Sequence, residues 1–150
     1  TDNYNNIKSI IEATSSIGCK IIFPIHPRTE KKLKSYDIFS LVDSNHNFIL
    51  TKPLNYHHSI FLIKNSKCVI TDSGGMQKEA YILGTPCITM REDTEWVETV
   101  NDGWNVLVGA DKDKILSYAC NFNPNEPRKN HYGDGSSSRK IVDIISQYKF

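Results

Sequence analysis

Hydrophobic residues in this chain alternate between helical spacing and short continuous runs. The first stretch carries isoleucines at 7, 10, 11 and 17, and it predicts a helix that begins behind Asp2 as N-cap and stops at Gly18. Compact apolar runs predict buried strands; they lie at Lys20–Ile25, Phe48–Leu50, Cys68–Thr71, Pro86–Met90 and Asn105–Val108. Further helices are predicted between and after these strands, at Glu30–Ser35, Tyr56–Lys64, Met76–Leu83, Lys112–Cys120 and, carrying Ile141 and Ile145, after Ser136–Ser138.

Short apolar strands that alternate with helices are typical of a parallel sheet covered by helices on both faces. A length of 150 residues with 39% hydrophobic content fits one soluble domain. We therefore predict a doubly wound α/β domain over residues 1–150. Ligands of such folds bind beyond the carboxyl ends of the strands, so the residues that follow each strand are the candidate site.

Composition limits the classes of partner. A formal net charge of +1 provides no basic field, so nucleic acid is not expected as a partner. No apolar run approaches the ~20 residues that span a bilayer, and the polar start is unlike a signal peptide, so we expect no membrane partner. The four cysteines form no Cys-x-x-Cys pair, which favours reduced thiols used as small hydrophobic residues in a cytoplasmic protein; a disulfide or zinc framework is the alternative.

The most informative segment follows the strand at Cys68–Thr71. It reads Asp72-Ser73-Gly74-Gly75 and leads directly into a predicted helix. Glycines allow close approach of the backbone to a ligand, and free N–H groups at a helix start bind phosphate. Ser73 adds a hydroxyl, and the carboxylate of Glu79 could accept hydrogen bonds from a ribose diol. A glycine turn that merely joins strand to helix is the alternative.

Two other strand ends carry weaker signals. His26-Pro27-Arg28-Thr29 follows the first strand and suits an anionic ligand, although a surface turn fits equally well. The run Arg91–Trp96 follows another strand; Arg91 could reach a diphosphate and Trp96 could stack on a base. Its three carboxylates match no metal-ligand spacing, so we predict no metal site and interpret them as a solvated helix start.

Three further motifs do not support a function. Asp-Ser-Gly-Gly is similar to the nucleophile segment of chymotrypsin-like proteases, but its strand and helix flanks do not fit that all-β fold. A P-loop would need Gly-x-x-x-x-Gly-Lys, which is absent from the sequence. His57 and His58 point about 100° apart on a helix, which makes a shared metal difficult and favours a structural or surface role.

The whole chain resembles one family, the non-hydrolysing UDP-N-acetylglucosamine 2-epimerases. The resemblance rests on the run Thr71–Ala80 (TDSGGMQKEA) with Leu83–Pro86 (LGTP). It extends in order through further segments, namely Thr1–Asn3, His26–Thr29, Arg91 with Thr94–Glu98, Gly103–Asn105 and Asn130–Gly135.

The resemblance implies the C-terminal, Rossmann-like half of a two-domain fold of the glycosyltransferase-B type. Such enzymes invert C2 of the sugar by eliminating UDP and adding it back, with no cofactor, and polysaccharide biosynthesis is the expected setting. Carried over, Ser73, Gly74 and Gly75 hold the diphosphate, Glu79 the ribose and Trp96 the uracil end. His26 assists catalysis, with Arg91 nearby.

The same resemblance implies what this chain lacks. The carboxylates that handle the C2 proton belong to the family's N-terminal domain, through which the full-length enzymes form homodimers. The chain alone is therefore expected to bind UDP without turnover. It departs from the family at Ser59, where an aromatic residue usually packs by the uracil, so a weaker uracil contact is expected. A glycosyltransferase of the same fold and a non-catalytic UDP-sugar-binding module remain the alternatives, and the acetamido sugar is undetermined.

Overall fold

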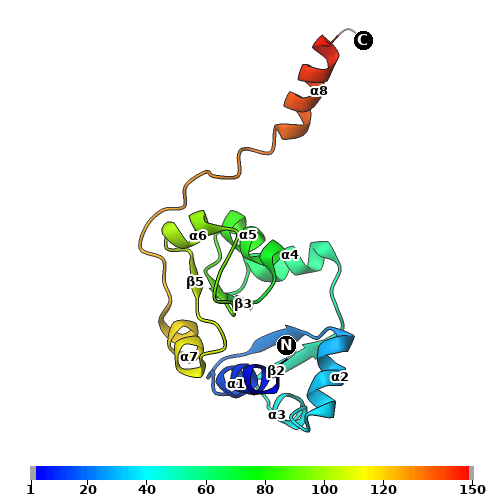
Figure 1. The fold of residues 1–150 in the computed structure, drawn as a ribbon, viewed down its shortest axis with the longest axis vertical. Helices are drawn as coiled ribbons and strands as arrows, with labels where there is room; N and C mark the ends of the chain where they lie inside the picture. Colours follow the sequence, from blue (N-terminus) through cyan, green and yellow to red (C-terminus); the bar gives the residue numbers. More distant parts are fainter. Residues whose placement is uncertain (1–2, 149–150) are drawn as a thin grey trace.

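The computed structural model describes residues 3–148, which form short parallel strands surrounded by helices (Figure 1). The strands are β1 (Ile21–Pro24), β2 (Phe48–Thr51), β3 (Val69–Thr71), β4 (Cys87–Thr89) and β5 (Asn105–Leu107). The helices are α1 (Tyr4–Ser15), α2 (Pro27–Ser35), α3 (Ser40–Asp43), α4 (Tyr56–Lys64), α5 (Gly74–Leu83), α6 (Val97–Asn101), α7 (Lys112–Asn121) and α8 (Ser137–Gln147). None of these helices is both long and apolar enough to cross a membrane.

The strands pair in two groups. β1 and β2 form one parallel pair, with Ile21 opposite Phe48, and β3, β4 and β5 form a second parallel sheet with β4 in its centre. The α/β class and the parallel direction are thus as predicted, but the strands form two separate sheets instead of one. Side chains connect the two groups, because Ile21 packs into the same apolar cluster as Ile88 of β4.

Helix α1 contributes to the core of both strand groups. Ile7 and Ile11 pack with Leu33 and Val42 around the β1–β2 pair. Ala13 and Ile17, at the other end of the same helix and just beyond it, pack with Ile88 and Ile115 around the three-stranded sheet. A third cluster, formed by Ile63, Val69, Ala80 and Cys87, fixes α4 and α5 against β3 and β4. This packing sets the start of α5 at the end of β3.

Several boundaries differ from the predictions for local reasons. The first helix is capped by Asn3, whose side chain accepts from the backbone N–H groups of Asn5 and Asn6; Asp2 lies outside the described residues. Helix α2 starts at Pro27, earlier than predicted, because proline suits the first helical position and His26 caps it. The short helices α3 and α6 were not predicted, since each spans about one turn and has no clear period.

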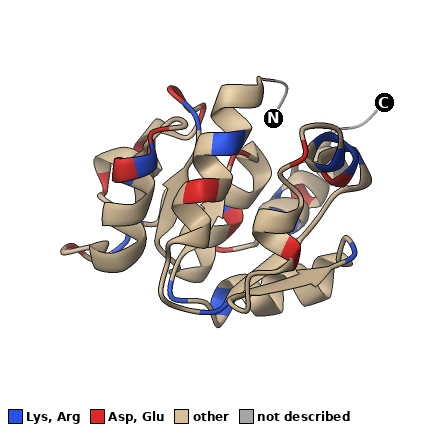
Figure 2. Cartoon of the chain, turned by 90° about the horizontal axis from the view of Figure 1, so that it is seen from below, with Lys and Arg blue, Asp and Glu red and all other residues tan. Residues whose placement is uncertain are grey.

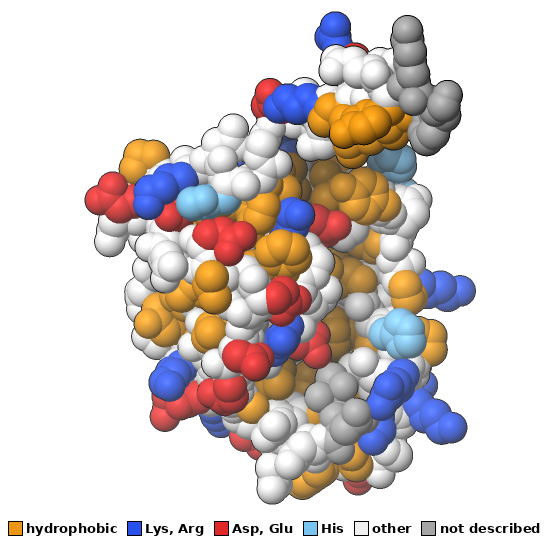
Figure 3. Space-filling view, turned by 45° about the horizontal axis from the view of Figure 1, so that its top comes forward, with side chains coloured by type: hydrophobic (Ala, Val, Ile, Leu, Met, Phe, Trp, Pro, Cys, Tyr) orange, Lys and Arg blue, Asp and Glu red, His pale blue; other side chains and the backbone are white. Residues whose placement is uncertain are grey.

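The last helix stands apart from the rest. α8 follows an extended segment and projects from the body of the molecule (Figure 1), and it has no buried residue. Its apolar side chains Ile141, Val142, Ile144 and Ile145 are all more than half exposed, and hydrophobic side chains line this helix in Figure 3. The predicted amphipathic helix is confirmed, but nothing in the described chain covers its apolar face.

Candidate functional site

The predicted phosphate-binding turn lies at the start of α5. β3 ends at Thr71, and Ser73 adopts an extended conformation as N-cap, where its hydroxyl accepts a long 3.5 Å hydrogen bond from the Met76 N–H. The Thr71 hydroxyl accepts from the Ser73 N–H at 3.1 Å and fixes the turn. The N–H groups of the first helical turn have no helical partner and carry partial positive charge. The arrangement can therefore receive an anion.

The segment after β4 lies against this helix start. A methyl group on Gly74 would overlap the Glu95 carboxylate, and it would lie 3.6 Å from Nε1 of Trp96. Gly75 is different, since a methyl group there would meet only the Ser73 hydroxyl at 4.0 Å. A side chain at the first position of α5 would therefore require the Glu95 carboxylate to move, whereas the second position has room for a small side chain.

Arg91 belongs to the same group of residues. Its guanidinium donates to Glu95 at 3.0 Å and to Asp93 at 3.3 Å. Glu92 points elsewhere, because its carboxylate packs against Gly109. The carboxylates of the acidic run thus contact Arg91, Gly74 and Gly109. Within the described residues, no cluster of three His, Cys, Asp or Glu side chains could hold a metal.

A buried polar network beneath the loop fixes it in place. Gln77 is fully buried, and its Oε1 accepts from the Thr94 hydroxyl at 2.6 Å and from the Asn105 amide at 3.1 Å. Asn105 in turn accepts from Thr89 at 2.7 Å and donates to Thr99 at 3.1 Å. This network ties α5, β4, β5 and α6 together. This network was not predicted; its signal in the sequence is the polar residues Thr89 and Asn105 inside otherwise apolar strands.

Trp96 is held by two neighbours. Its ring packs edge to face against Tyr132 at 5.8 Å between centroids, and the Lys78 ammonium lies 4.7 Å from the Trp96 ring and 4.8 Å from the Tyr132 ring. Burial, with the Glu98 carboxylate beside it, raises the pKa of Tyr132 above its usual range, so its hydroxyl stays protonated. Tyr132 comes from the segment before α8, far along the chain from α5.

Asp102 anchors that segment. The carboxylate is 3% exposed and accepts hydrogen bonds from Tyr81 Oη, from Lys129 Nζ at 3.0 Å and from Nε2 of His131 at 2.9 Å. The Tyr81 hydroxyl, followed by Lys129 and His131, holds the pKa of Asp102 well below its usual range. A buried ionised carboxylate with these donors locks the segment around residue 130 onto α5 and α6.

The structure does not bring all predicted residues together. His26 caps α2, with its Nδ1 accepting from the Arg28 N–H at 3.2 Å, and no contact among the described residues joins it to Gly74 or Trp96. Glu79 is half-buried on α5, and its carboxylate makes no hydrogen bond or ion pair within residues 3–148. It remains available to a ligand.

The helix before β3 presents other candidates. Ser59 is half-buried on α4, and Tyr56, three residues earlier and on the same face, is 64% exposed. Tyr56 therefore presents an exposed aromatic ring beside Ser59 on this helix. His57 and His58 are exposed, in agreement with a surface position.

The cysteines are all free: Cys19, Cys68, Cys87 and Cys120 form no disulfide. Only part of the prediction that they act as small hydrophobic residues is confirmed. Cys87 is buried and Cys68 partly buried, whereas Cys19 and Cys120 are exposed.

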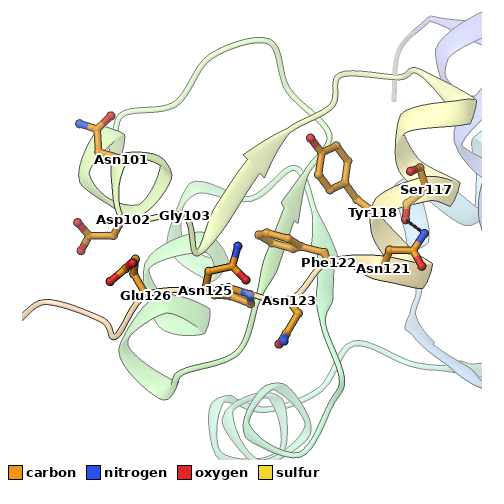
Figure 4. A pocket seen from close by; sticks show the side chains of 11 residues that line it. Asn101, Asp102, Gly103, Ser117, Tyr118, Asn121, Phe122, Asn123, Asn125 and Glu126 are labelled. Carbon is orange, nitrogen blue, oxygen red and sulfur yellow. Dashed lines mark hydrogen bonds between the residues drawn. The ribbon is translucent and has the colours of Figure 1, made fainter.

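A separate surface hollow lies between α6, α7 and the segment that follows α7 (Figure 4). Tyr118, Phe122 and Glu126 are among its lining residues, and none of the predicted site residues contributes to it. The hollow is therefore not part of the α5 site. Over the chain as a whole, charged side chains of both signs are interspersed (Figure 2).

Known proteins match the chain over nearly its full length. One relative, a UDP-N-acetylglucosamine 2-epimerase homolog from Methanococcus maripaludis, is 49% identical over 97% of this chain and 41% of the relative. A UDP-2,3-diacetamido-2,3-dideoxy-D-glucuronate 2-epimerase from Pseudomonas aeruginosa is 36% identical over 98% of the chain and 41% of its own length. The solved Methanocaldococcus jannaschii UDP-GlcNAc 2-epimerase in complex with UDP-GlcNAc and UDP superposes with a TM-score of 0.87 at 40% identity, over 98% of this chain and 42% of that structure.

The chain thus spans about two fifths of the length of these relatives. The family model for UDP-N-acetylglucosamine 2-epimerase matches residues 1–146. With this match and the Rossmann-like fold, the chain belongs to the UDP-N-acetylglucosamine 2-epimerase family.

Proposed function

We propose that this chain is the UDP-binding half of a UDP-sugar 2-epimerase. The observation that carries the proposal is the start of α5 at the end of β3, in a member of this family. There the backbone N–H groups of Gly74 and Gly75 have no helical partner, and the Ser73 hydroxyl caps the same turn. The solved Methanocaldococcus jannaschii relative of the same fold is a complex with UDP-GlcNAc and UDP.

Each site residue has a proposed role. The Ser73–Gly75 turn holds the diphosphate, with Arg91 beside it, and the unpaired Glu79 carboxylate accepts from the ribose hydroxyls. Trp96 closes the nucleotide site from the loop after β4. His26 stands at the end of β1 and acts near the diphosphate once a second domain closes over the strand ends.

The proposed reaction inverts C2 of a UDP-2-acetamido sugar. Removal of the C2 proton and departure of UDP from C1 leave a C1–C2 double bond. A proton is then delivered to the opposite face of C2, and UDP adds back to C1. The helix start stabilises the negative charge that develops on departing UDP. The acids and bases at C2 belong to the remaining three fifths of the enzyme, so we propose that this chain alone binds UDP without turnover. One relative is a UDP-2,3-diacetamido-2,3-dideoxy-D-glucuronate 2-epimerase, so the proposal is limited to the 2-acetamido class.

The setting of the whole enzyme is also a proposal. Four free thiols support a reducing, cytoplasmic environment. We propose that the whole enzyme works in polysaccharide biosynthesis as a homodimer whose subunits meet mainly through the N-terminal domain.

Calorimetric titration of the purified chain with UDP tests the proposal, with uridine and ADP as comparison ligands. We expect UDP to bind and uridine and ADP to bind less tightly, with a loss of roughly 3- to 10-fold in Ser73→Ala and in Glu79→Ala. Ser146→Ala and Glu126→Ala, at exposed positions away from α5, serve as matched controls and should bind as the wild type does. A folded chain that does not bind millimolar UDP contradicts the proposal.

A further inference from the structure

The indole N–H of Trp96 is buried without a partner. Its Nε1 atom is inaccessible to solvent and makes no hydrogen bond within the described chain. A buried donor left unpaired costs about 1–3 kcal/mol, and most such groups in folded proteins are paired. Trp104 provides the contrast, since its Nε1 donates to the Glu126 carbonyl at 2.8 Å. The unpaired state of Trp96 therefore calls for an explanation.

The position of Nε1 indicates what it faces. It lies 3.6 Å from the point where a side chain on Gly74 would begin, and a carboxylate oxygen of Glu95 approaches the same point. The indole N–H and the first turn of α5 thus border one small volume. The Glu95 carboxylate thus already occupies this volume, where it forms an ion pair with the Arg91 guanidinium at 3.0 Å between nitrogen and oxygen.

The ring cannot easily turn away from this volume. The Trp96 backbone N–H donates to the Thr94 hydroxyl at 3.1 Å, and its carbonyl accepts from the Thr99 hydroxyl at 2.7 Å. Tyr132 packs at one edge and the Lys78 ammonium lies over the ring. These contacts fix the direction of the N–H and occupy ring surface that a stacked base would need.

We infer that Trp96 recognises the diphosphate of UDP through its indole N–H, in the place where Glu95 lies in the free chain. The inference rests on the proposed UDP function and changes the expected role of Trp96, from contact with the uracil end to donation to phosphate. When the diphosphate enters, it replaces the Glu95 carboxylate at the start of α5, and Arg91 becomes available to the ligand. The exchange favours a ligand with more negative charge than one carboxylate, which selects diphosphates over the bare nucleoside.

Trp96→Phe removes the N–H and retains an aromatic ring against Tyr132, and Trp104→Phe is the matched control. We expect Trp96→Phe to weaken UDP binding by roughly 3- to 10-fold and to leave uridine binding unchanged, while Trp104→Phe changes neither. We expect Glu95→Gln, which removes the competing charge, to bind UDP several-fold more tightly. An equal loss for UDP and uridine in Trp96→Phe would mean a uracil contact and overturn the inference.

A measurement on the wild-type chain avoids any question of variant folding. The two indole N–H groups give separate signals in a ¹H–¹⁵N correlation spectrum, and we expect UDP to shift the Trp96 signal and leave the Trp104 signal in place. If UDP binds, with Ser73→Ala weakening it, and the Trp96 signal does not move, the inference fails and the proposed function stands. If the wild-type chain binds no UDP, both fail.

Discussion

At the scale of single residues, Asp102 combines deep burial with full ionisation. Its partners Tyr81, Lys129 and His131 hold its pKa below the ordinary value of 3.8, so the native state favours the charged form. Such a group stabilises the fold fully above its unfolded-state pKa, and this contribution is lost as the pH falls toward the lower native pKa.

We therefore expect Asp102→Asn to lower the thermal midpoint at pH 7 by several degrees. The gap between wild type and variant should persist down to about pH 4 and shrink below it, as the wild-type carboxylate is protonated. Thermal unfolding followed by circular dichroism from pH 7 to pH 3 measures this. A gap that widens on acidification would contradict the assignment.

The cysteines differ in burial and therefore in reactivity. Cys87 is 1% exposed in β4, and burial raises the pKa of its thiol to about 12, whereas Cys19 and Cys120 are exposed. Because the thiolate is the reactive form, alkylation at pH 8 should label Cys19 and Cys120 first and leave Cys87 unmodified. Mass spectrometry after timed labelling measures this, and labelling in urea should reach all four thiols. Native labelling of Cys87 at the rate of Cys19 would be incompatible with its position.

Part of the candidate site could be predicted at this scale. Ser73, Gly74 and Gly75 follow a strand and open a helix, and that local order is visible in the sequence. The network around Gln77 could not be predicted, because its partners Thr94 and Asn105 lie 17 and 28 positions away and become neighbours only in the fold.

At the scale of elements, glycines show which helix ends are constrained. Gly84 ends α5 in the left-handed region at φ +75°, where a Cβ would also meet Arg128 at 3.2 Å. Gly18, after α1, has no atom within 4 Å of the same position. Gly84→Ala should lower the free energy of unfolding by about 1–2 kcal/mol, and Gly18→Ala should change it by less than about 0.5 kcal/mol. Urea unfolding gives both values; equal effects would refute the distinction.

Helices and strands with a clear period were predicted, and short ones were not. α4, α5 and α7 lie close to their predicted limits because their apolar positions repeat over two or more turns. α3 and α6 are only four and five residues long, so their formation depends on packing against neighbours. The start of α2 was missed for a different reason, since His26 looked like a ligand and also serves as N-cap.

At the scale of the molecule, α8 is the least integrated element. Because it buries no residue, deletion of residues 136–150 should leave the free energy of unfolding within about 0.5 kcal/mol of the wild type. The same deletion removes an exposed apolar face and should reduce self-association at high protein concentration. Urea unfolding and sedimentation velocity test the two parts. A large loss of stability would mean that α8 packs onto the body.

The α/β class followed from alternating strands and helices, and the order of the five strands and of the longer helices was predicted correctly, without α3 and α6. The division of the strands into two sheets was not predicted, because the apolar runs look alike whether or not their backbones pair. Only the three-dimensional packing decides that Ile21 reaches Ile88 through its side chain.

The division into two sheets has a consequence for how the chain opens. Within residues 3–148 no backbone ladder joins the β1–β2 pair to the other sheet, so each group could unfold as a separate foldon. Helix α1 prevents this, since Ile7 and Ile11 are buried in one core and Ala13 in the other. Opening either group exposes part of this helix, which couples the two into one cooperative transition. In native-state hydrogen exchange, the amides of α1 should therefore exchange only through global unfolding, with the same denaturant dependence as those of β4.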